Sequence, residues 1–123
     1  MKLDHINIAA PMKLLETVRD FYCEILGFDE GYRPGFSKRG FWLYADDKPL
    51  IHLIESDVHQ AHEQPGHLDH IAFRSAGLDQ LKRRLEANRI EYRTMYNSEL
   101  NMSQVFFKDP AGTGLEFNFP GES

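Results

Sequence analysis

The sequence has very little cysteine and no long apolar run, and these two absences exclude several classes of protein. Its single cysteine, Cys23, has no partner for an internal disulfide. That cysteine usage is typical of a reducing compartment, so we expect a cytoplasmic protein. No stretch of about 18 apolar residues is present, so we predict no membrane-spanning helix. The polar start, Met1 to His5, is not that of a signal peptide.

An excess of positive charge is also missing. The chain carries 14 Lys and Arg against 19 Asp and Glu, for a net charge of −5. Nucleic-acid binders usually present a basic surface, so we expect no nucleic-acid partner. With 123 residues, 41% of them hydrophobic and 27% charged, the composition is that of one globular domain.

An internal repeat is the most informative feature that the sequence does contain. Residues 3–8 read Leu-Asp-His-Ile-Asn-Ile, and residues 68–73 read Leu-Asp-His-Ile-Ala-Phe. A helical pattern of apolar residues follows each copy, ended by Gly27 after the first and by Asn88, the expected left-handed cap, after the second. The apolar positions are Leu15, Val18, Tyr22, Ile25 and Leu26, then Leu78, Leu81 and Leu85. Two copies at this spacing predict two tandem modules that arose by duplication.

Alternating apolar residues and turn signals predict four strands in each module. The strands are expected near residues 2–9, 28–33, 40–45 and 49–55, then near 68–74, 90–96, 103–108 and 114–119. The fold class is therefore α+β, with two βαβββ modules in a single domain over residues 1–123. The modules span 1–55 and 68–119, and a polar connector spans 56–67.

Four possible metal ligands lie at equivalent places in the two modules. His5 and His70 fall on the first strand of each module, whereas His52 and Glu116 fall on the last. Side chains alternate across a sheet, so all four are predicted on the face opposite the apolar residues. One histidine on a strand is usually a surface or hydrogen-bonded residue, but the repetition favours a metal site. Three imidazoles and a carboxylate suit one zinc, nickel, iron or manganese ion.

The sequence resembles the vicinal oxygen chelate superfamily, which includes glyoxalase I, extradiol dioxygenases, fosfomycin resistance proteins and bleomycin resistance proteins. The resemblance covers nearly the whole chain and depends on both copies of the repeat and on three further segments. These are Phe21 to Phe28, Phe107 to Gly112, and Leu115-Glu116-Phe117. It implies two βαβββ modules whose mixed sheet forms a cup around a divalent metal, with ligands at His5, His52, His70 and Glu116.

One position departs from the glyoxalase pattern. Glyoxalase I usually has glutamate or glutamine where this chain has His52. Glu116 is then the expected catalytic base, and His52 is either a fourth ligand or a catalytic acid/base beside the site. In the second case His5, His70 and Glu116 form the two-histidine, one-carboxylate triad of iron dioxygenases.

Six further residues are predicted to contact the substrate. Asn7 and Asn118 neighbour the ligands on the same face, and Arg74 suits an anionic group or an ion pair with Glu91. The three aromatic residues predict either an aromatic wall or core packing. The six residues are Arg74, Asn7, Asn118, Trp42, Tyr44 and Phe106.

These observations favour a metal-dependent lyase or isomerase of the glyoxalase type, similar to lactoylglutathione lyase. Its substrate would be a small molecule that chelates the metal through adjacent oxygens. The alternatives are an iron-dependent dioxygenase and a metal-free binding protein of the bleomycin resistance type. Each small module leaves sheet edges exposed, so we expect a homodimer. The connector histidines, His59, His62 and His67, are not expected to form a second metal site.

Overall fold

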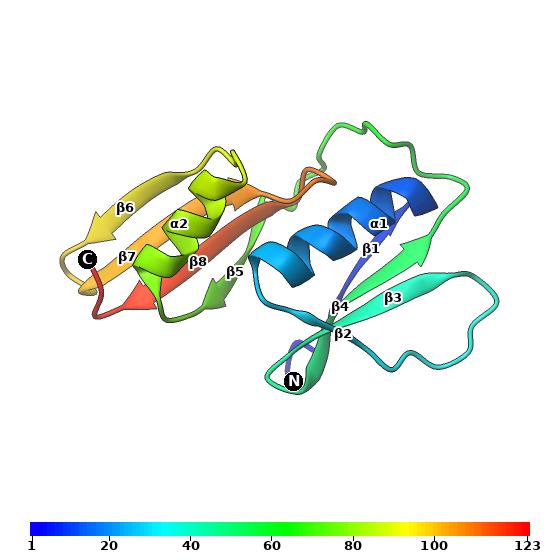
Figure 1. Ribbon diagram of the computed structural model, residues 1–123, viewed down its shortest axis with the longest axis horizontal. Helices are drawn as coiled ribbons and strands as arrows, with labels where there is room; N and C mark the ends of the chain where they lie inside the picture. The colour runs from blue at the N-terminus through cyan, green and yellow to red at the C-terminus, as the bar shows by residue number, and fades with distance from the viewer. The chain divides into compact units, whose positions relative to one another are not determined.

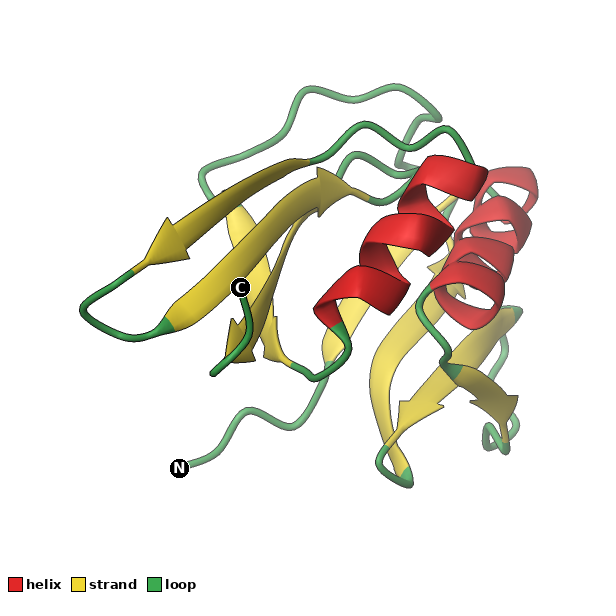
Figure 2. Cartoon of the chain, turned by 60° about the vertical axis from the view of Figure 1, so that its left-hand side comes forward, coloured by secondary structure: helices red, strands yellow, loops and turns green.

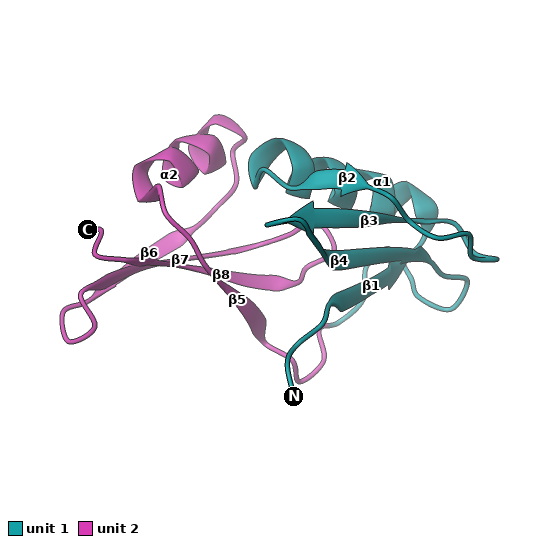
Figure 3. Ribbon diagram, turned by 90° about the horizontal axis from the view of Figure 1, so that it is seen from below, with its two compact units in different colours: residues 1–64 teal, residues 65–123 magenta.

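The computed structural model describes all 123 residues, which form two compact units, Met1–Gln64 and Pro65–Ser123 (Figure 3). Each unit has a four-stranded sheet, with a helix along one face (Figure 2). The predicted α+β architecture of two tandem βαβββ modules is confirmed. No helix of the chain has the length and apolar character needed to cross a membrane.

The first unit begins with β1 (Ile6–Ala10), α1 (Met12–Asp20) and a π-helical turn, η1 (Phe21–Ile25). The strands β2 (Asp29–Gly31), β3 (Gly40–Ala45) and β4 (Lys48–Glu55) follow (Figure 1). The sheet order is β1-β4-β3-β2, in which β1 runs parallel to β4 and the other pairs are antiparallel. The first strand starts four residues later than predicted, so His5 lies just before it.

The second unit repeats this topology. It contains β5 (His70–Arg74), α2 (Leu78–Ala87), β6 (Arg93–Asn97), β7 (Met102–Lys108) and β8 (Gly114–Pro120). The order is β5-β8-β7-β6, with β5 parallel to β8. In both units the first and last strands are therefore neighbours, which brings the predicted ligands of each unit close together.

The predicted apolar faces form the cores. In the first unit the helical residues that the periodicity selected are buried, apart from the half-buried Leu26, and they pack against the inner face of the sheet. In the second unit α2 buries Leu78, Leu81 and Leu85, while β8 buries Leu115, Phe117 and Phe119. Burial of alternate strand residues leaves the opposite face of each sheet for polar side chains.

One of the two predicted helix ends is confirmed and the other is not. The first helix becomes π-helical at Phe21, which keeps Phe21, Tyr22 and Ile25 buried on one side; Gly27 then ends it at φ 80°, as predicted. The prediction of Asn88 as the left-handed cap was wrong, because Asn88 has φ −101° and Arg89 takes the left-handed conformation at φ 56°. The Asn88 amide instead donates its side-chain N–H to the Arg84 carbonyl at 2.8 Å.

Candidate functional site

In the first unit two of the predicted ligands lie ring against ring. The His5 and His52 ring centroids are 3.8 Å apart with an interplanar angle of 13°. Trp42 stacks on the other face of His52 at 4.0 Å and 12°. Register explains the second contact, since Trp42 on β3 is paired directly with His52 on β4. His52 is thus held between two aromatic rings.

The stacked position leaves one nitrogen of His52 without a partner. Its Nε2 is buried and forms no hydrogen bond; the Nε of Arg33, in the loop before β3, is the other such side-chain atom in the chain. Burial lowers the pKa of His52, and the neighbouring His5 lowers it further. His52 therefore favours the neutral imidazole, the form that accepts a proton or binds a metal.

In the second unit His70 and Glu116 form a direct pair. His70 Nε2 lies 2.8 Å from Glu116 Oε2, and His70 Nδ1 lies 2.8 Å from Asp69 Oδ2. The parallel pairing of β5 with β8 places Glu116 beside this strand start. Hydrogen bonding to Asp69, followed by the charge of Glu116, raises the pKa of His70. An imidazole nitrogen and a carboxylate oxygen are thus held within reach of one ion.

A glutamine that sequence reasoning missed fixes the orientation of Glu116. Gln104 on β7 donates its side-chain N–H to Glu116 Oε1 at 2.7 Å and to Asn118 Oδ1 at 3.2 Å. Glu116 is only 9% exposed, so its two oxygens have few other partners. Because Gln104 occupies Oε1, Oε2 is the oxygen that faces His70.

The aspartates of the repeat have the same contact in both units. Asp4 Oδ2 lies 2.6 Å from His5 Nδ1, in parallel with the Asp69–His70 contact. A carboxylate on one ring nitrogen orients the ring and leaves the other nitrogen for a metal. Both aspartates stand in the repeated Leu-Asp-His-Ile motif, so the repeat itself carries this signal.

The ring stack limits how the predicted ligands combine. A metal lies in the plane of an imidazole ligand, about 2.0–2.1 Å from its nitrogen. The near-parallel rings of His5 and His52 have separate planes, so one ion cannot lie in both in this conformation. No group of three or more His, Cys, Asp or Glu side chains is gathered as a metal site. Each unit instead supplies two of the four predicted ligands.

The predicted substrate residues have varied surroundings. Trp42 belongs to the ring stack, and Phe106 lies edge-on to His70 with the centroids 6.5 Å apart. Asn118 receives the hydrogen bond from Gln104 described above. The Tyr44 hydroxyl donates to the Tyr32 carbonyl, which ties it to the loop after β2. Asn7 pairs in register with His52.

Arg74, the sixth of these residues, is exposed at the end of β5 and forms no ion pair with Glu91. Its side chain is therefore available to an anionic group in solution.

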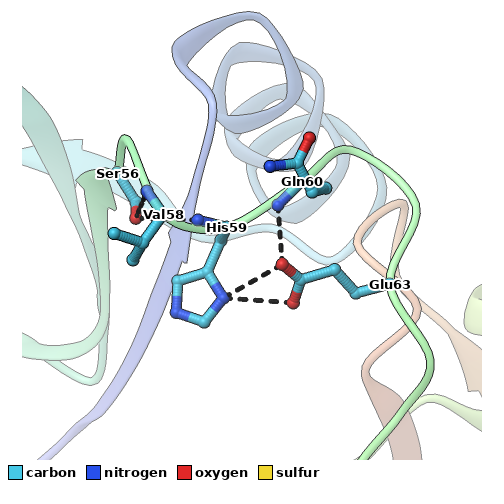
Figure 4. Close-up of polar contacts among 5 residues, drawn as sticks. All are labelled: Ser56, Val58, His59, Gln60 and Glu63. Carbon is cyan, nitrogen blue, oxygen red and sulfur yellow. Dashed lines mark hydrogen bonds and ion pairs between the residues drawn. The ribbon is translucent and has the colours of Figure 1, made fainter.

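The connector histidine His59 forms a local polar turn with Glu63 (Figure 4). The Glu63 carboxylate lies 3.0 Å from His59 Nδ1 and accepts the Gln60 backbone N–H at 2.6 Å. The Ser56 hydroxyl oxygen accepts two further backbone N–H groups, those of Val58 and His59. These contacts order the start of the connector through its own residues.

Comparisons with known proteins agree on one family. The profile of the Glyoxalase/Bleomycin resistance protein/Dioxygenase superfamily matches residues 2–117. A protein from Bacillus anthracis assigned to the glyoxalase family is 25% identical to this chain, with a TM-score of 0.77. The match covers 98% of this chain and 95% of the Bacillus anthracis protein. No curated protein matches the chain.

Two other solved structures share the fold at lower identity. The E126Q mutant of the fosfomycin resistance protein FosX from Listeria monocytogenes, complexed with Mn(II) and 1S,2S-dihydroxypropylphosphonic acid, is 19% identical with a TM-score of 0.71. The match covers 99% of this chain and 93% of the FosX chain. Lactoylglutathione lyase from Agrobacterium tumefaciens is 18% identical with a TM-score of 0.68, and the coverages are 96% and 92%. The chain belongs to the Glyoxalase/Bleomycin resistance protein/Dioxygenase superfamily, the vicinal oxygen chelate superfamily.

Proposed function

We propose that the chain is a metal-dependent enzyme of the glyoxalase type, a lyase or isomerase that acts on a small molecule with adjacent oxygens. The observation that carries this proposal is the His70–Glu116 pair, whose donor atoms lie 2.8 Å apart. Asp69 contacts the other ring nitrogen of His70, and Gln104 donates a hydrogen bond to the other carboxylate oxygen of Glu116. Such outer partners are usual around metal ligands in proteins.

The donor chemistry fits a divalent ion. A neutral imidazole and a carboxylate suit zinc, nickel, iron or manganese, and FosX, a structure with the same fold, holds Mn(II). A bound ion of this kind polarises the oxygens of a chelating substrate and makes a neighbouring proton easier to remove. His70 and Glu116 are the two ligands that the contacts support best, and His5 is the third that we propose.

We propose His52 as a proton-transfer group rather than a fourth ligand, because its ring is stacked on that of His5. Its lowered pKa keeps it neutral and able to accept a proton near pH 7. Glu116 is the catalytic base we propose for an isomerisation, since it is the carboxylate of the set. Asn7, Asn118, Trp42, Tyr44, Phe106 and Arg74 remain the residues proposed for substrate contact.

A dioxygenase is the second candidate. The ring stack favours a three-residue ligand set, His5, His70 and Glu116, over a four-residue set. Two histidines and one carboxylate are also the ligands of iron-dependent oxygenases. The metal that is bound after purification separates the two chemistries: zinc or nickel favours proton transfer, and iron favours oxygen chemistry.

Metal analysis of protein purified without chelators tests the proposal. We expect stoichiometric divalent metal in the wild type and a loss of most of it in His70→Ala. His62→Ala is the matched control, because His62 is exposed in the connector. Full occupancy in His70→Ala would overturn the assignment of His70 as a ligand. No metal in the wild type would overturn the proposal and favour the metal-free binding protein.

We also propose a homodimer in which the ligand set depends on assembly. Metal binding and dimerisation are then linked, because the ion binds only the assembled form. Mixing His5→Ala chains with His70→Ala chains tests whether two copies share one set. If two copies share their ligands, each mixed dimer contains one intact set of ligands, and metal binding returns. If each chain uses only its own ligands, mixing restores no metal binding.

A further inference from the structure

A cavity of about 800 Å³ opens in the second unit beside His70. It lies at the end of the sheet where β5 and β8 begin and β7 ends. Its lining includes His70, Arg93, Phe106, Lys108 and Gly114. A volume of this size is typical of sites for small organic molecules.

Gly114 lies between two of these residues in the sheet. It pairs with Lys108 on one side and with His70 on the other, so the three residues form a row across the sheet. A Cβ at this position would lie 2.2 Å from the Asp69 carbonyl oxygen and 3.0 Å from His70 Cβ. Only glycine fits there, because the Asp69 carbonyl and His70 approach its backbone closely at the cavity wall.

The neighbouring row supplies a second cation in a fixed position. Arg93 pairs with Phe106, and its guanidinium carbon lies 4.2 Å above the Phe106 ring centroid. Stacking uses the face of the guanidinium and leaves its N–H edges free to donate. Its one hydrogen bond is a long contact of 3.7 Å with the sulfur of Met95.

Neither cation forms an ion pair with an acid on the cavity wall. The hydrogen bond to His70 lowers the pKa of Asp69, and the charges of Lys108 and Arg93 lower it further, but neither cation lies within ion-pair distance of Asp69 or Glu91. Arg93 and Lys108 are therefore available to an anionic group on a ligand. Glu91 also lines the cavity, and its charge disfavours a second anionic end.

We propose that this cavity binds an organic oxyanion, a small apolar molecule with one carboxylate or phosphonate group. The oxyanion contacts Arg93 and Lys108, and the apolar body lies against Phe106. Charge-assisted hydrogen bonds from arginine and lysine are strong contacts for such a group. As the substrate site of the enzyme, the cavity rests on the proposed function, since the bound molecule lies next to His70.

Calorimetric titration of the full chain, kept in chelator so that no metal contributes, tests this inference. The probes are phenylphosphonate and benzoate, which separate the two oxyanions, and benzyl alcohol, which lacks the charge. We expect at least one of the two anions to bind and benzyl alcohol to bind at least about tenfold more weakly, because charged hydrogen bonds carry the affinity. Arg93→Gln and Lys108→Gln should each weaken binding of the anion by a similar factor. Arg83→Gln, on the exposed face of α2, should leave the affinity unchanged.

Three results would overturn the inference: no binding of either anion, equal binding of benzyl alcohol, or unchanged affinity in both cavity variants. If Arg93→Gln fails to fold, Lys108→Gln provides the test, because Lys108 is exposed at a strand end. Metal binding is measured separately on the same variants. Oxyanion binding without metal binding would reject only the proposed function, and metal binding without oxyanion binding would reject only this inference.

Discussion

Replacing Gln104 with leucine removes the hydrogen bond that orients Glu116 while keeping the volume of the side chain. The donor lies 2.7 Å from Glu116 Oε1. Loss of such an outer partner typically weakens metal binding about 10–100-fold. At 1.4 kcal/mol per factor of ten, this corresponds to about 1.4–2.8 kcal/mol.

Mn(II) titration followed by electron paramagnetic resonance measures this change directly, because free Mn(II) has a strong signal and bound Mn(II) a weak one. Gln80→Leu is the matched control, since Gln80 is exposed on α2 and far along the chain from β8. We expect weaker binding in Gln104→Leu only. An unchanged affinity in a folded Gln104→Leu protein would refute the role of Gln104 in orienting the carboxylate.

Three further predictions address the base, the tail and the cysteine. Glu116→Gln, in protein that keeps its metal, should lower turnover of an isomerisation by about 10²–10⁴-fold, measured by steady-state kinetics; unchanged turnover would assign the base to His52. Glu122→Gln should lower the free energy of unfolding by about 0.5–2 kcal/mol in denaturant titrations, because Glu122 accepts the backbone N–H groups of Gly77, just before α2, and of Leu78, its first residue; no change would exclude this capping role. Burial raises the pKa of Cys23, so less thiolate is present at pH 8 and iodoacetamide should react more slowly than with free cysteine; a faster reaction would contradict this.

The repeat and the strand alternation were sufficient to predict the fold. All eight strands and both helices occur where the periodicity placed them, within a few residues at their ends. The reason is that burial on one face is strongly encoded in alternating apolar residues. Helix ends were less certain: the left-handed residue after α2 is Arg89 rather than Asn88, since Asn88 uses its side chain to bond the helix.

The contacts of the candidate site could be predicted only in part. The alternation of side chains along each strand placed His70 and Glu116 on one face of the sheet. The pairing of β5 with β8 makes them neighbours. The stacking of His52 with Trp42 and the bond from Gln104 depend on the register between strands. Register follows from turn geometry and packing over the whole sheet, which residue spacing within one strand does not reveal.

The same limit applies to the cavity beside Gly114. A glycine at a strand start is common, and nothing in its sequence neighbours indicates that Lys108 and His70 flank it. The pairing of three strands brings these residues into one row. Cross-strand neighbours of this kind become visible only in the folded sheet.

Whether His70 and Glu116 bind a divalent metal can be measured by titrating Mn(II) into isotopically labelled protein and following the side-chain resonances by NMR. Mn(II) broadens the signals of nuclei close to it. We expect the His70 ring and the Gln104 side-chain amide to broaden first, at substoichiometric metal. Broadening centred on His59 and His62 in the connector, with His70 unaffected, would contradict it.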